Sequence, residues 1–258
     1  MLAPIERGAG PAVTFLHGFT QRATSWSEVW GLLPGGRRLV AVDLPGHGDS
    51  SDAGATLPEA AAALAATWDR LGIERSDLVG YSLGGRLALW VAATLPGRVT
   101  RLVTIGAHAG FEGPARDRRL VSDEALARRI EAEGVERFAT YWAGLPLFSG
   151  LRQRGPERLA ELDRMRRQNR ASGLAASLRG MGGAATPPFW DRLPAASAPA
   201  LLLAGERDEP YVEHAQRLRS QIPGARVGLV PGAGHPAHLE QPQRVAALLA
   251  RALERPAT

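Results

Sequence analysis

The segment Val79-Gly80-Tyr81-Ser82-Leu83-Gly84-Gly85 is the most informative part of this chain. An apolar run, Asp77–Tyr81, precedes its serine, and an amphipathic run, Gly84–Leu95, follows it. Between a strand and a helix, a Gly-x-Ser-x-Gly pattern forms a sharp, strained turn that exposes the serine hydroxyl. A serine that merely caps a helix in a glycine-rich turn is the alternative. The strand before and the helix after favour Ser82 as a reactive serine.

Short apolar runs alternate with longer helical patterns along most of the chain. The predicted strands are Ala12–His17, Arg38–Leu44, Asp77–Tyr81, Val99–Ile105, Ala200–Ala204 and Arg226–Val230. The predicted helices are Ser25–Leu33, Leu57–Leu71, Gly84–Leu95, Val212–Gln221 and Pro242–Leu253. Buried strands that alternate with helices imply an α/β fold, with a mostly parallel sheet flanked by helices on both faces.

The alternation stops between Gly110 and Leu193. This span contains helical patterns only, at Ser122–Glu133, Val135–Trp142, Pro156–Arg167 and Gly173–Met181. Because it lies between two core strands, we interpret it as a helical cap inserted over the C-terminal edge of the sheet, where open α/β sheets bind ligands. A separate all-helical domain is the alternative, but it would leave both halves of the sheet incomplete. The predicted division is core 1–109, cap 110–194 and core 195–258.

A serine needs a histidine held by an acid before it can act as a nucleophile or a base. Among the six histidines, His235 is the best candidate, because it ends the loop Pro231–His235 after the last predicted strand. The acid is expected after the preceding strand. We choose Asp208 there, with Glu206 and Glu209 as rivals. The order serine, acid, histidine along the chain is the one that this strand–turn–helix setting requires.

Two backbone N–H groups near the serine are expected to form an oxyanion hole. Leu83, directly after the serine, would supply one, and Phe19, in the loop after the first predicted strand, would supply the other. His17 is expected to shape that loop. Of the other histidines, His47 is expected to be structural and His108 to lie near the pocket.

The composition excludes several classes of site. The chain has 258 residues, is 45% hydrophobic and contains no cysteine, so disulfides, thiolate metal sites and a cysteine nucleophile are excluded. The net charge is +5, and every basic residue is an arginine. The arginines are interleaved with acidic residues, as in Arg128-Arg129-Ile130-Glu131, which favours solvated helix faces over a nucleic-acid groove.

No segment of the sequence indicates a membrane span or a leader. No apolar run approaches the roughly 20 residues that a spanning helix needs, and residues 1–11 lack the apolar region of a signal peptide. We therefore expect a cytoplasmic protein that acts on a small molecule, as a monomer or weak homo-oligomer. No cofactor and no metal are expected.

Five motifs together resemble the α/β-hydrolase superfamily along nearly the whole chain. They are Leu16–Phe19, Asp43–Gly48, the serine turn, Gly205–Asp208 and Gly232–His235. The resemblance is specific for the fold and for a Ser-His-Asp triad, but not for the reaction, because this fold hosts many chemistries. The family often begins with a strand hairpin. The segment before Ala12 leaves little room for it, so we expect a sheet with fewer strands than usual.

The cap carries a narrower resemblance, to the 2-succinyl-6-hydroxy-2,4-cyclohexadiene-1-carboxylate synthases of menaquinone biosynthesis. The matching segments are Gly84–Leu89, Arg119–Ala127, Tyr141–Phe148, Arg166–Asn169 and Gly173–Gly182. The resemblance implies a lyase that eliminates pyruvate from 2-succinyl-5-enolpyruvyl-6-hydroxy-3-cyclohexene-1-carboxylate. Ser82 would then accept a ring proton and form no acyl-enzyme. One departure is Thr186, which stands where this family usually has glutamine.

A substrate with several carboxylates calls for arginine side chains, whose planar forks match carboxylate geometry. Arg86 lies one helical turn after Ser82 and can therefore face the same pocket. The resemblance also nominates Arg119 and Arg166 from the cap, with Tyr81 and Trp142 as pocket walls. Solvated charge is the alternative for each cap arginine, and plain packing for the tryptophan. Close rivals are Arg116, Arg118 and Arg167.

Two other functions are compatible with this fold. A serine hydrolase for small carboxylic esters or carbon–carbon bonds would use the same triad, but a pocket for neutral esters would not need Arg86 beside the serine. A non-catalytic ligand-binding protein would have no use for an intact triad. Arg86 is therefore the feature that favours the lyase over the hydrolase.

Overall fold

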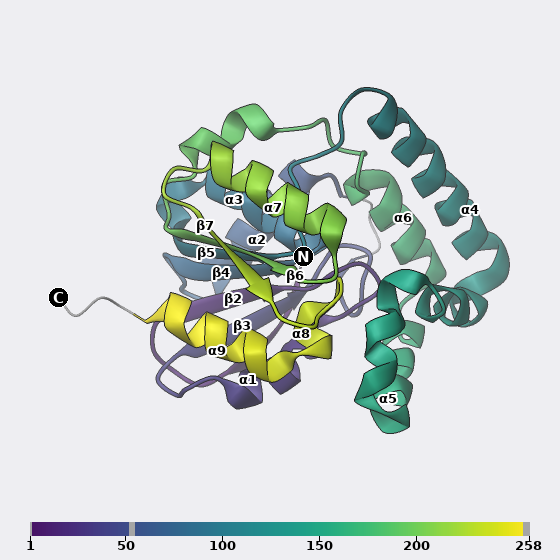
Figure 1. The fold of residues 1–258 in the computed structure, drawn as a ribbon, viewed down its shortest axis with the longest axis horizontal. Coiled ribbons are helices and arrows are strands. Elements are labelled where there is room, and N and C mark those ends of the chain that lie inside the picture. Colours follow the sequence, from purple (N-terminus) through teal and green to yellow (C-terminus); the bar gives the residue numbers. More distant parts are fainter. Residues whose placement is uncertain (1, 52–54, 255–258) are drawn as a thin grey trace.

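A seven-stranded sheet runs through the molecule (Figure 1). The computed structural model describes residues 2–51 and 55–254, and the strand order in space is β1-β3-β2-β4-β5-β6-β7. The strands are β1 (Ala3–Arg7), β2 (Ala12–Leu16), β3 (Arg38–Asp43), β4 (Ser76–Tyr81), β5 (Val99–Ile105), β6 (Ala200–Gly205) and β7 (Arg226–Val230). β1 runs antiparallel to β3, and every other neighbouring pair of these strands is parallel.

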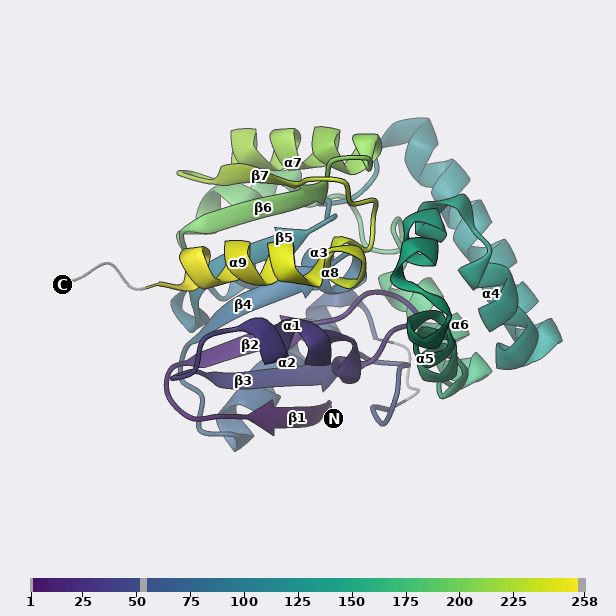
Figure 2. The same ribbon diagram turned by 60° about the horizontal axis from the view of Figure 1, so that its bottom comes forward.

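Helices cover both faces of the sheet (Figure 2). One face carries α2 (Leu57–Arg70), α3 (Leu83–Thr94) and α7 (Glu209–Gln221), and the other carries α1 (Ser27–Leu32) and α9 (Pro242–Leu253). Successive side chains of β4 point to opposite faces of the sheet: Leu78 packs in one apolar core and Val79 in the other. The predicted α/β architecture is confirmed. In the part of the chain that the structure describes, no helix has the length and apolarity to span a membrane.

The remaining long helices lie together beside the sheet (Figures 1 and 2). They are α4 (Gly113–Ala143), the 3-10 helix η3 (Pro146–Arg154), α5 (Pro156–Arg167) and α6 (Ala171–Met181). We call these four elements the cap. The cap has a small apolar core of its own, which includes Ile130, Phe138 and Leu174. Phe19, from the loop after β2, packs against this core. The exact division at residues 110 and 194 stays a prediction.

Short helical segments complete the fold. They are η1 (Ala23–Trp26), η2 (Pro96–Arg98), η4 (Trp190–Ala195) and α8 (Ala237–Glu240). The loop before α8 carries His235, and η1 follows the loop that carries Phe19. These short elements therefore set the path of two loops at the C-terminal edge of the sheet.

The structure differs from the prediction at the N-terminus and in the cap. The sequence predicted little room for a strand hairpin before Ala12 and did not predict β1, the one strand that the structure describes there and that pairs with β3. Its alternation is weak and it contains Pro4, which an edge strand tolerates. The first cap helix begins at Gly113, nine residues before the predicted start. The two predicted helices Ser122–Glu133 and Val135–Trp142 are halves of α4, bent at Gly134 with φ +75°.

The turn between β4 and α3 has no room for side chains at its glycines, which gives a direct test. A methyl group on Gly84 would lie 2.3 Å from the carbonyl oxygen of Leu16, whereas one on Gly97 would meet nothing within 4 Å. We expect Gly84→Ala to lower the free energy of unfolding by about 3 kcal/mol and Gly97→Ala to change it by less than about 0.5 kcal/mol. Urea unfolding measures both. Equal stability of the two variants would contradict the close approach at Gly84.

Candidate active site

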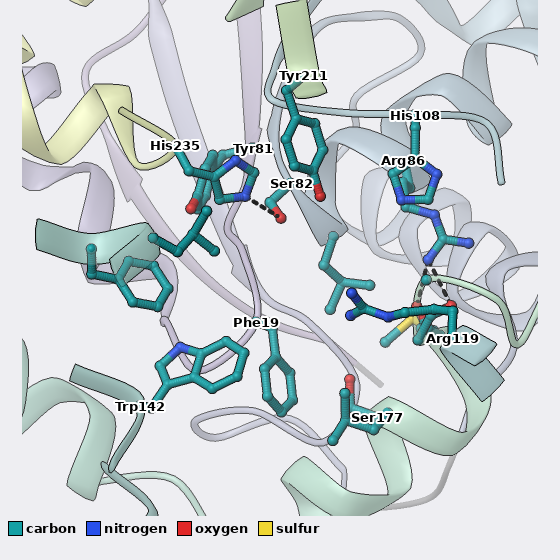
Figure 3. A pocket seen from close by; sticks show the side chains of 17 residues that line it. Phe19, Tyr81, Ser82, Arg86, His108, Arg119, Trp142, Ser177, Tyr211 and His235 are labelled. Atoms are coloured by element: carbon teal, nitrogen blue, oxygen red, sulfur yellow. Dashed lines mark hydrogen bonds between the residues drawn. The ribbon is translucent and has the colours of Figure 1, made fainter. Parts of the chain in front are cut away.

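Three side chains from separate loops meet at the C-terminal edge of the sheet. Ser82 lies between β4 and α3, Asp208 between β6 and α7, and His235 after β7. His235 Nε2 lies 3.1 Å from Ser82 Oγ (Figure 3), and His235 Nδ1 lies 2.7 Å from Asp208 Oδ2. An ionised carboxylate only accepts hydrogen bonds, so Nδ1–H donates to Asp208 and Nε2 is left to accept the serine proton. The structure therefore brings together the three residues that the sequence nominated.

The rival acids lie elsewhere in the same loop region. Glu206 accepts a hydrogen bond from the backbone N–H of Gly232 at 2.8 Å, and it is exposed. Glu209 is the first residue of α7 and is also exposed. Asp208, by contrast, is 5% exposed and contacts the histidine directly. Of the three acids, Asp208 has the geometry of the residue that orients His235.

The backbone at Ser82 is strained. Its φ is +50° and its ψ −110°, a region that side chains with a Cβ rarely adopt and that costs of order 1–3 kcal/mol. Two close approaches hold the turn: methyl groups on Gly80 and Gly84 would each lie 2.3 Å from a carbonyl oxygen. The Ser82 N–H also donates to the Ile105 carbonyl of β5 at 2.9 Å. In this backbone conformation the Ser82 side chain points to His235 at the edge of the sheet.

Phe19 and Leu83 both line the cavity that contains Ser82. Leu83 is the first residue of α3, so its N–H has no partner within the helix. Both residues therefore lie at the cavity, as an oxyanion hole beside Ser82 would require. Their role in stabilising negative charge stays a prediction.

The cavity over Ser82 has an empty volume of about 740 Å³, which includes its open mouth. Concave sites that combine apolar walls with a few polar groups are where proteins usually bind small molecules. The floor of this cavity comes from the sheet edge and α3, and its roof from the cap, where Trp142 and Ser177 face inward (Figure 3). Phe148 of the cap also lines the cavity. Tyr81 and Trp142 therefore lie where pocket walls were expected.

Arg86 places a buried positive charge in the same cavity. It is 3% exposed, and its Nη1 donates to the carbonyls of Met181 and Gly182 at 2.9 and 2.8 Å. Among the residues that the structure describes, its Nε and Nη2 have no hydrogen-bond partner. Burial lowers its pKa to about 10, so the side chain stays charged at neutral pH. A buried charge that lacks a carboxylate partner is costly, and an anionic ligand would offset that cost.

The two cap arginines occupy different surroundings. Arg119 lines the cavity and forms an ion pair with Asp123, Nε to Oδ1 at 2.8 Å. Arg166 is also buried, at 5% exposed, but it does not line this cavity. Its guanidinium carbon lies 5.7 Å from the centroid of the Phe148 ring, which does line the cavity, and burial lowers its pKa. The structure brings Arg119 to the pocket and leaves Arg166 behind its wall.

Sequence reasoning missed Tyr211 as a pocket residue. Tyr211 lines the cavity, and its ring centroid lies 4.3 Å from that of His235. It stands three residues after Asp208 in the first turn of α7, a spacing that places it on the same side as the acid. His108 also lines the cavity, as expected. Burial lowers the His108 pKa well below its usual value, so this imidazole is neutral at pH 7.

A family model described as the alpha/beta hydrolase fold matches residues 11–242 of the chain. The chain belongs to the α/β-hydrolase family. A relative from Enterobacter sp. (strain 638), named 2-succinyl-6-hydroxy-2,4-cyclohexadiene-1-carboxylate synthase, is 36% identical over 245 residues, which cover 94% of this chain and 92% of the relative. The resemblance to this family is therefore confirmed over most of the chain.

Solved structures of other α/β hydrolases agree closely with this fold. MenH from S. aureus superimposes with a TM-score of 0.90 at 27% identity and covers 97% of both chains. A thermophilic esterase from Thermogutta terrifontis superimposes with a TM-score of 0.85, also at 27% identity, over 97% of this chain and 92% of the esterase. MenH from S. aureus and the esterase are thus both similar to this chain in backbone.

Thr186 stands where the resembling family usually has glutamine. Its side chain is 7% exposed, and within residues 2–51 and 55–254 its hydroxyl has no hydrogen-bond partner. It is not among the residues that line the cavity around Ser82. The change at this position therefore lies outside the pocket wall.

Two buried histidines fix the loop that carries Phe19. His17 Nε2 accepts the backbone N–H of Leu44 at 2.9 Å, and His47 Nε2 accepts that of Thr20 at 3.2 Å. Both rings are fully buried, and burial lowers the pKa of His17 to about 4 and that of His47 to about 3. Both therefore stay neutral at the pH of the cell and serve as acceptors, which agrees with the structural roles expected for them.

The depressed pKa values of these histidines predict a pH-dependent stability. In the unfolded chain a histidine titrates near 6.5, so below that pH the unfolded state binds more protons than the folded state. The stability due to neutral His47 is complete above about pH 6.5 and falls as the pH drops towards 3, by up to about 1.4 kcal/mol per pH unit. Urea midpoints between pH 7.5 and 4.5 measure this slope. His47→Gln keeps an acceptor but cannot titrate, so it should flatten the slope; an unchanged slope would refute a neutral, buried His47.

Proposed function

We propose that this chain is a 2-succinyl-6-hydroxy-2,4-cyclohexadiene-1-carboxylate synthase, which eliminates pyruvate from 2-succinyl-5-enolpyruvyl-6-hydroxy-3-cyclohexene-1-carboxylate. The observation that carries the proposal is the charged, dehydrated Arg86 in the same cavity as the Ser82–His235 pair. The relative from Enterobacter sp. supports it, since that protein bears this name at 36% identity.

In the proposed mechanism the triad acts as a base. His235 takes the hydroxyl proton of Ser82 while the Ser82 oxygen removes a ring proton from the substrate. The electrons of the broken carbon–hydrogen bond move onto the carbonyl oxygen of the succinyl group, where the N–H groups of Phe19 and Leu83 would stabilise the charge. Collapse of this enolate expels the enolpyruvyl oxygen, and His235 returns the proton as pyruvate forms. Asp208 keeps the histidine oriented and stabilises its charged form.

Recognition of the substrate would depend on the arginines. Arg86 lines the cavity, and two of its nitrogens have no hydrogen-bond partner among the described residues. Arg119 lines the same cavity from the cap. Each can donate charge-assisted hydrogen bonds to a carboxylate. Tyr81 and Trp142 supply apolar surface for the ring and the succinyl chain. We propose Arg166 as a more distant contributor that supports the pocket wall through Phe148.

A serine hydrolase is the second candidate, because the esterase from Thermogutta terrifontis has nearly the same backbone. A pocket for a neutral ester would leave the Arg86 charge without a partner, which disfavours this candidate. The deciding experiment supplies the enolpyruvyl cyclohexene substrate and follows pyruvate release, with a p-nitrophenyl ester in parallel. Fast ester turnover without pyruvate would overturn the lyase proposal.

Two broader properties accompany the proposed function. We infer that the partner is a small anionic molecule with several carboxylates, since the cavity is small and carries buried positive charge. We also infer an enzyme of the cytoplasm that works as a monomer or weak homo-oligomer and binds no nucleic acid. The interleaving of arginine with acidic residues along the helices supports the last point.

Removal of the serine hydroxyl tests the triad. Ser82→Ala is expected to lower kcat for pyruvate release by about 10³-fold or more, because the base loses the oxygen that contacts the substrate. Ser177→Ala, in the same cavity, is the control and should cost no more than about tenfold, the value of one hydrogen bond. Steady-state pyruvate assays measure both. A fully active Ser82→Ala protein would show that the site is misidentified.

Removal of the buried cation tests substrate recognition. Arg86→Ala is expected to lower kcat/KM for the lyase reaction by about 10- to 100-fold, the value of one charge-assisted hydrogen bond, and to affect ester turnover far less. Arg116→Ala is the matched control, because Arg116 donates to the Ala184 carbonyl of the same cap loop without lining the cavity. Equal losses in both reactions, or equal losses for both variants, would argue against a carboxylate ligand role for Arg86.

A further inference from the structure

Thr20, the residue after Phe19, has a backbone that needs support. Its φ is +68° and it is 2% exposed. Residues other than glycine rarely adopt this left-handed conformation, and a side chain branched at Cβ adopts it least easily. Such a conformation persists only where the surrounding structure holds it, so some contact must fix this loop.

A side chain from the cap supplies this contact. Asn169 Nδ2 donates to the carbonyl oxygen of Thr20 at 2.9 Å, and Asn169 Oδ1 accepts the backbone N–H of Gly48 at 2.9 Å. Asn169 lies in the turn between α5 and α6 and is 3% exposed. On the other side of Thr20, the ring of His47 accepts its N–H at 3.2 Å. Both peptide groups that flank the strained residue are thus fixed.

These hydrogen bonds connect to the N–H of Phe19 through two peptide groups. The peptide whose carbonyl Asn169 holds also carries the N–H of Gln21, and this N–H donates to the carbonyl of Gly18 at 3.1 Å. The Gly18 carbonyl belongs to the same rigid, planar peptide as the N–H of Phe19. His17 Nδ1 contacts the same Gly18 carbonyl at 2.8 Å. This series of hydrogen bonds therefore connects Asn169 of the cap to the peptide that carries the Phe19 N–H, and helps to set its direction.

We propose that Asn169 is a positioning residue, which aims the Phe19 N–H at the reacting oxygen by clamping the strained Thr20 peptide. The inference rests on the proposed function, since it assigns to the Phe19 N–H the stabilisation of the oxyanion. Its consequence is that the oxyanion hole is complete only when the cap is seated, because one of the groups that hold it comes from the α5–α6 turn. A structural staple between cap and core is the competing role of Asn169.

The two roles differ in what a substitution does to the kinetics. A positioning role acts on charge that develops in the transition state, so it lowers kcat and leaves ground-state binding nearly unchanged. We expect Asn169→Ala to lower kcat for pyruvate release about 10- to 100-fold, with KM within about threefold of the parent. Asn169→Asp should lose as much kcat, because an ionised carboxylate can still accept from Gly48 but cannot donate to Thr20.

The matched control is the neighbouring residue in the same turn. Gln168 accepts a hydrogen bond from Arg22 at 3.1 Å and therefore also joins cap to core, without touching the Thr20 peptide. Gln168→Ala should retain kcat within about threefold of the parent. If it loses as much kcat as Asn169→Ala, or if Asn169→Ala raises KM and spares kcat, Asn169 is only a staple and the proposal is overturned.

A second pair of variants tests the role of the strained backbone at Thr20. It compares the effect of Asn169→Ala in two backgrounds, so it does not depend only on how stable the single variant is. Glycine adopts a φ of +68° without cost, so Thr20→Gly should make the clamp less necessary. In a double-mutant cycle, Asn169→Ala is expected to cost at least about threefold less kcat in the Thr20→Gly background than in the parent. Equal losses in the two backgrounds would overturn the proposal.

The same variants are also assayed with p-nitrophenyl acetate, whose hydrolysis would need the same oxyanion hole. If the parent protein releases no pyruvate but hydrolyses the ester, the proposed lyase function fails while the role of Asn169 is still tested. A kcat loss for Asn169→Ala in the ester reaction would then support positioning, and unchanged ester kcat would overturn it.

Discussion

The whole site depends on one strained turn, in which Ser82 sits at φ +50° between β4 and α3. The strain is maintained because Gly80 and Gly84 let β4, α3 and the loop after β2 approach within contact distance of one another. Larger residues at either glycine would push these elements apart and relax the serine. Since β4 is at the centre of the sheet and buried along its whole length, the turn is anchored to the most rigid part of the molecule.

The cap supplies what the sheet edge lacks. Arg86 is on α3, but the carbonyls that receive its Nη1 belong to Met181 and Gly182 at the end of α6. In the same way, Phe19 belongs to the core, while Asn169 of the cap holds the peptide that follows it. The cap therefore orients both a buried cation and a backbone donor, besides closing the cavity. The esterase with a similar backbone shows that the fold accommodates other chemistry, so the backbone alone does not determine the reaction.

Local sequence patterns predicted most of the fold. They also predicted the three residues that meet at the sheet edge, Ser82, Asp208 and His235. Strands buried on both faces and amphipathic helices leave strong periodic signals, and the triad residues follow strands whose carboxyl ends lie at one edge. The predictions failed where the signal was weak. β1 is short and half-exposed and contains a proline, and the first turns of α4 are polar and exposed. Tyr211 was missed because its importance comes from its contact with His235, a residue from another loop.

The sequence by itself determined the strand, turn and helix around Ser82, because these follow from contacts between near neighbours along the chain. It also determined the order of serine, acid and histidine, because each of the three follows a strand with a clear apolar pattern. Only the tertiary structure decided which of the cap arginines lines the cavity, Arg119 and not Arg166. In a chain whose basic residues are all arginine, composition cannot distinguish a solvated guanidinium from a dehydrated one. That difference arises when distant segments fold over a side chain, as the end of α6 does over Arg86, while Arg166 is enclosed behind Phe148. Burial and unmet hydrogen bonds arise only when the elements pack together, and they distinguish the Arg86 guanidinium from a solvated one.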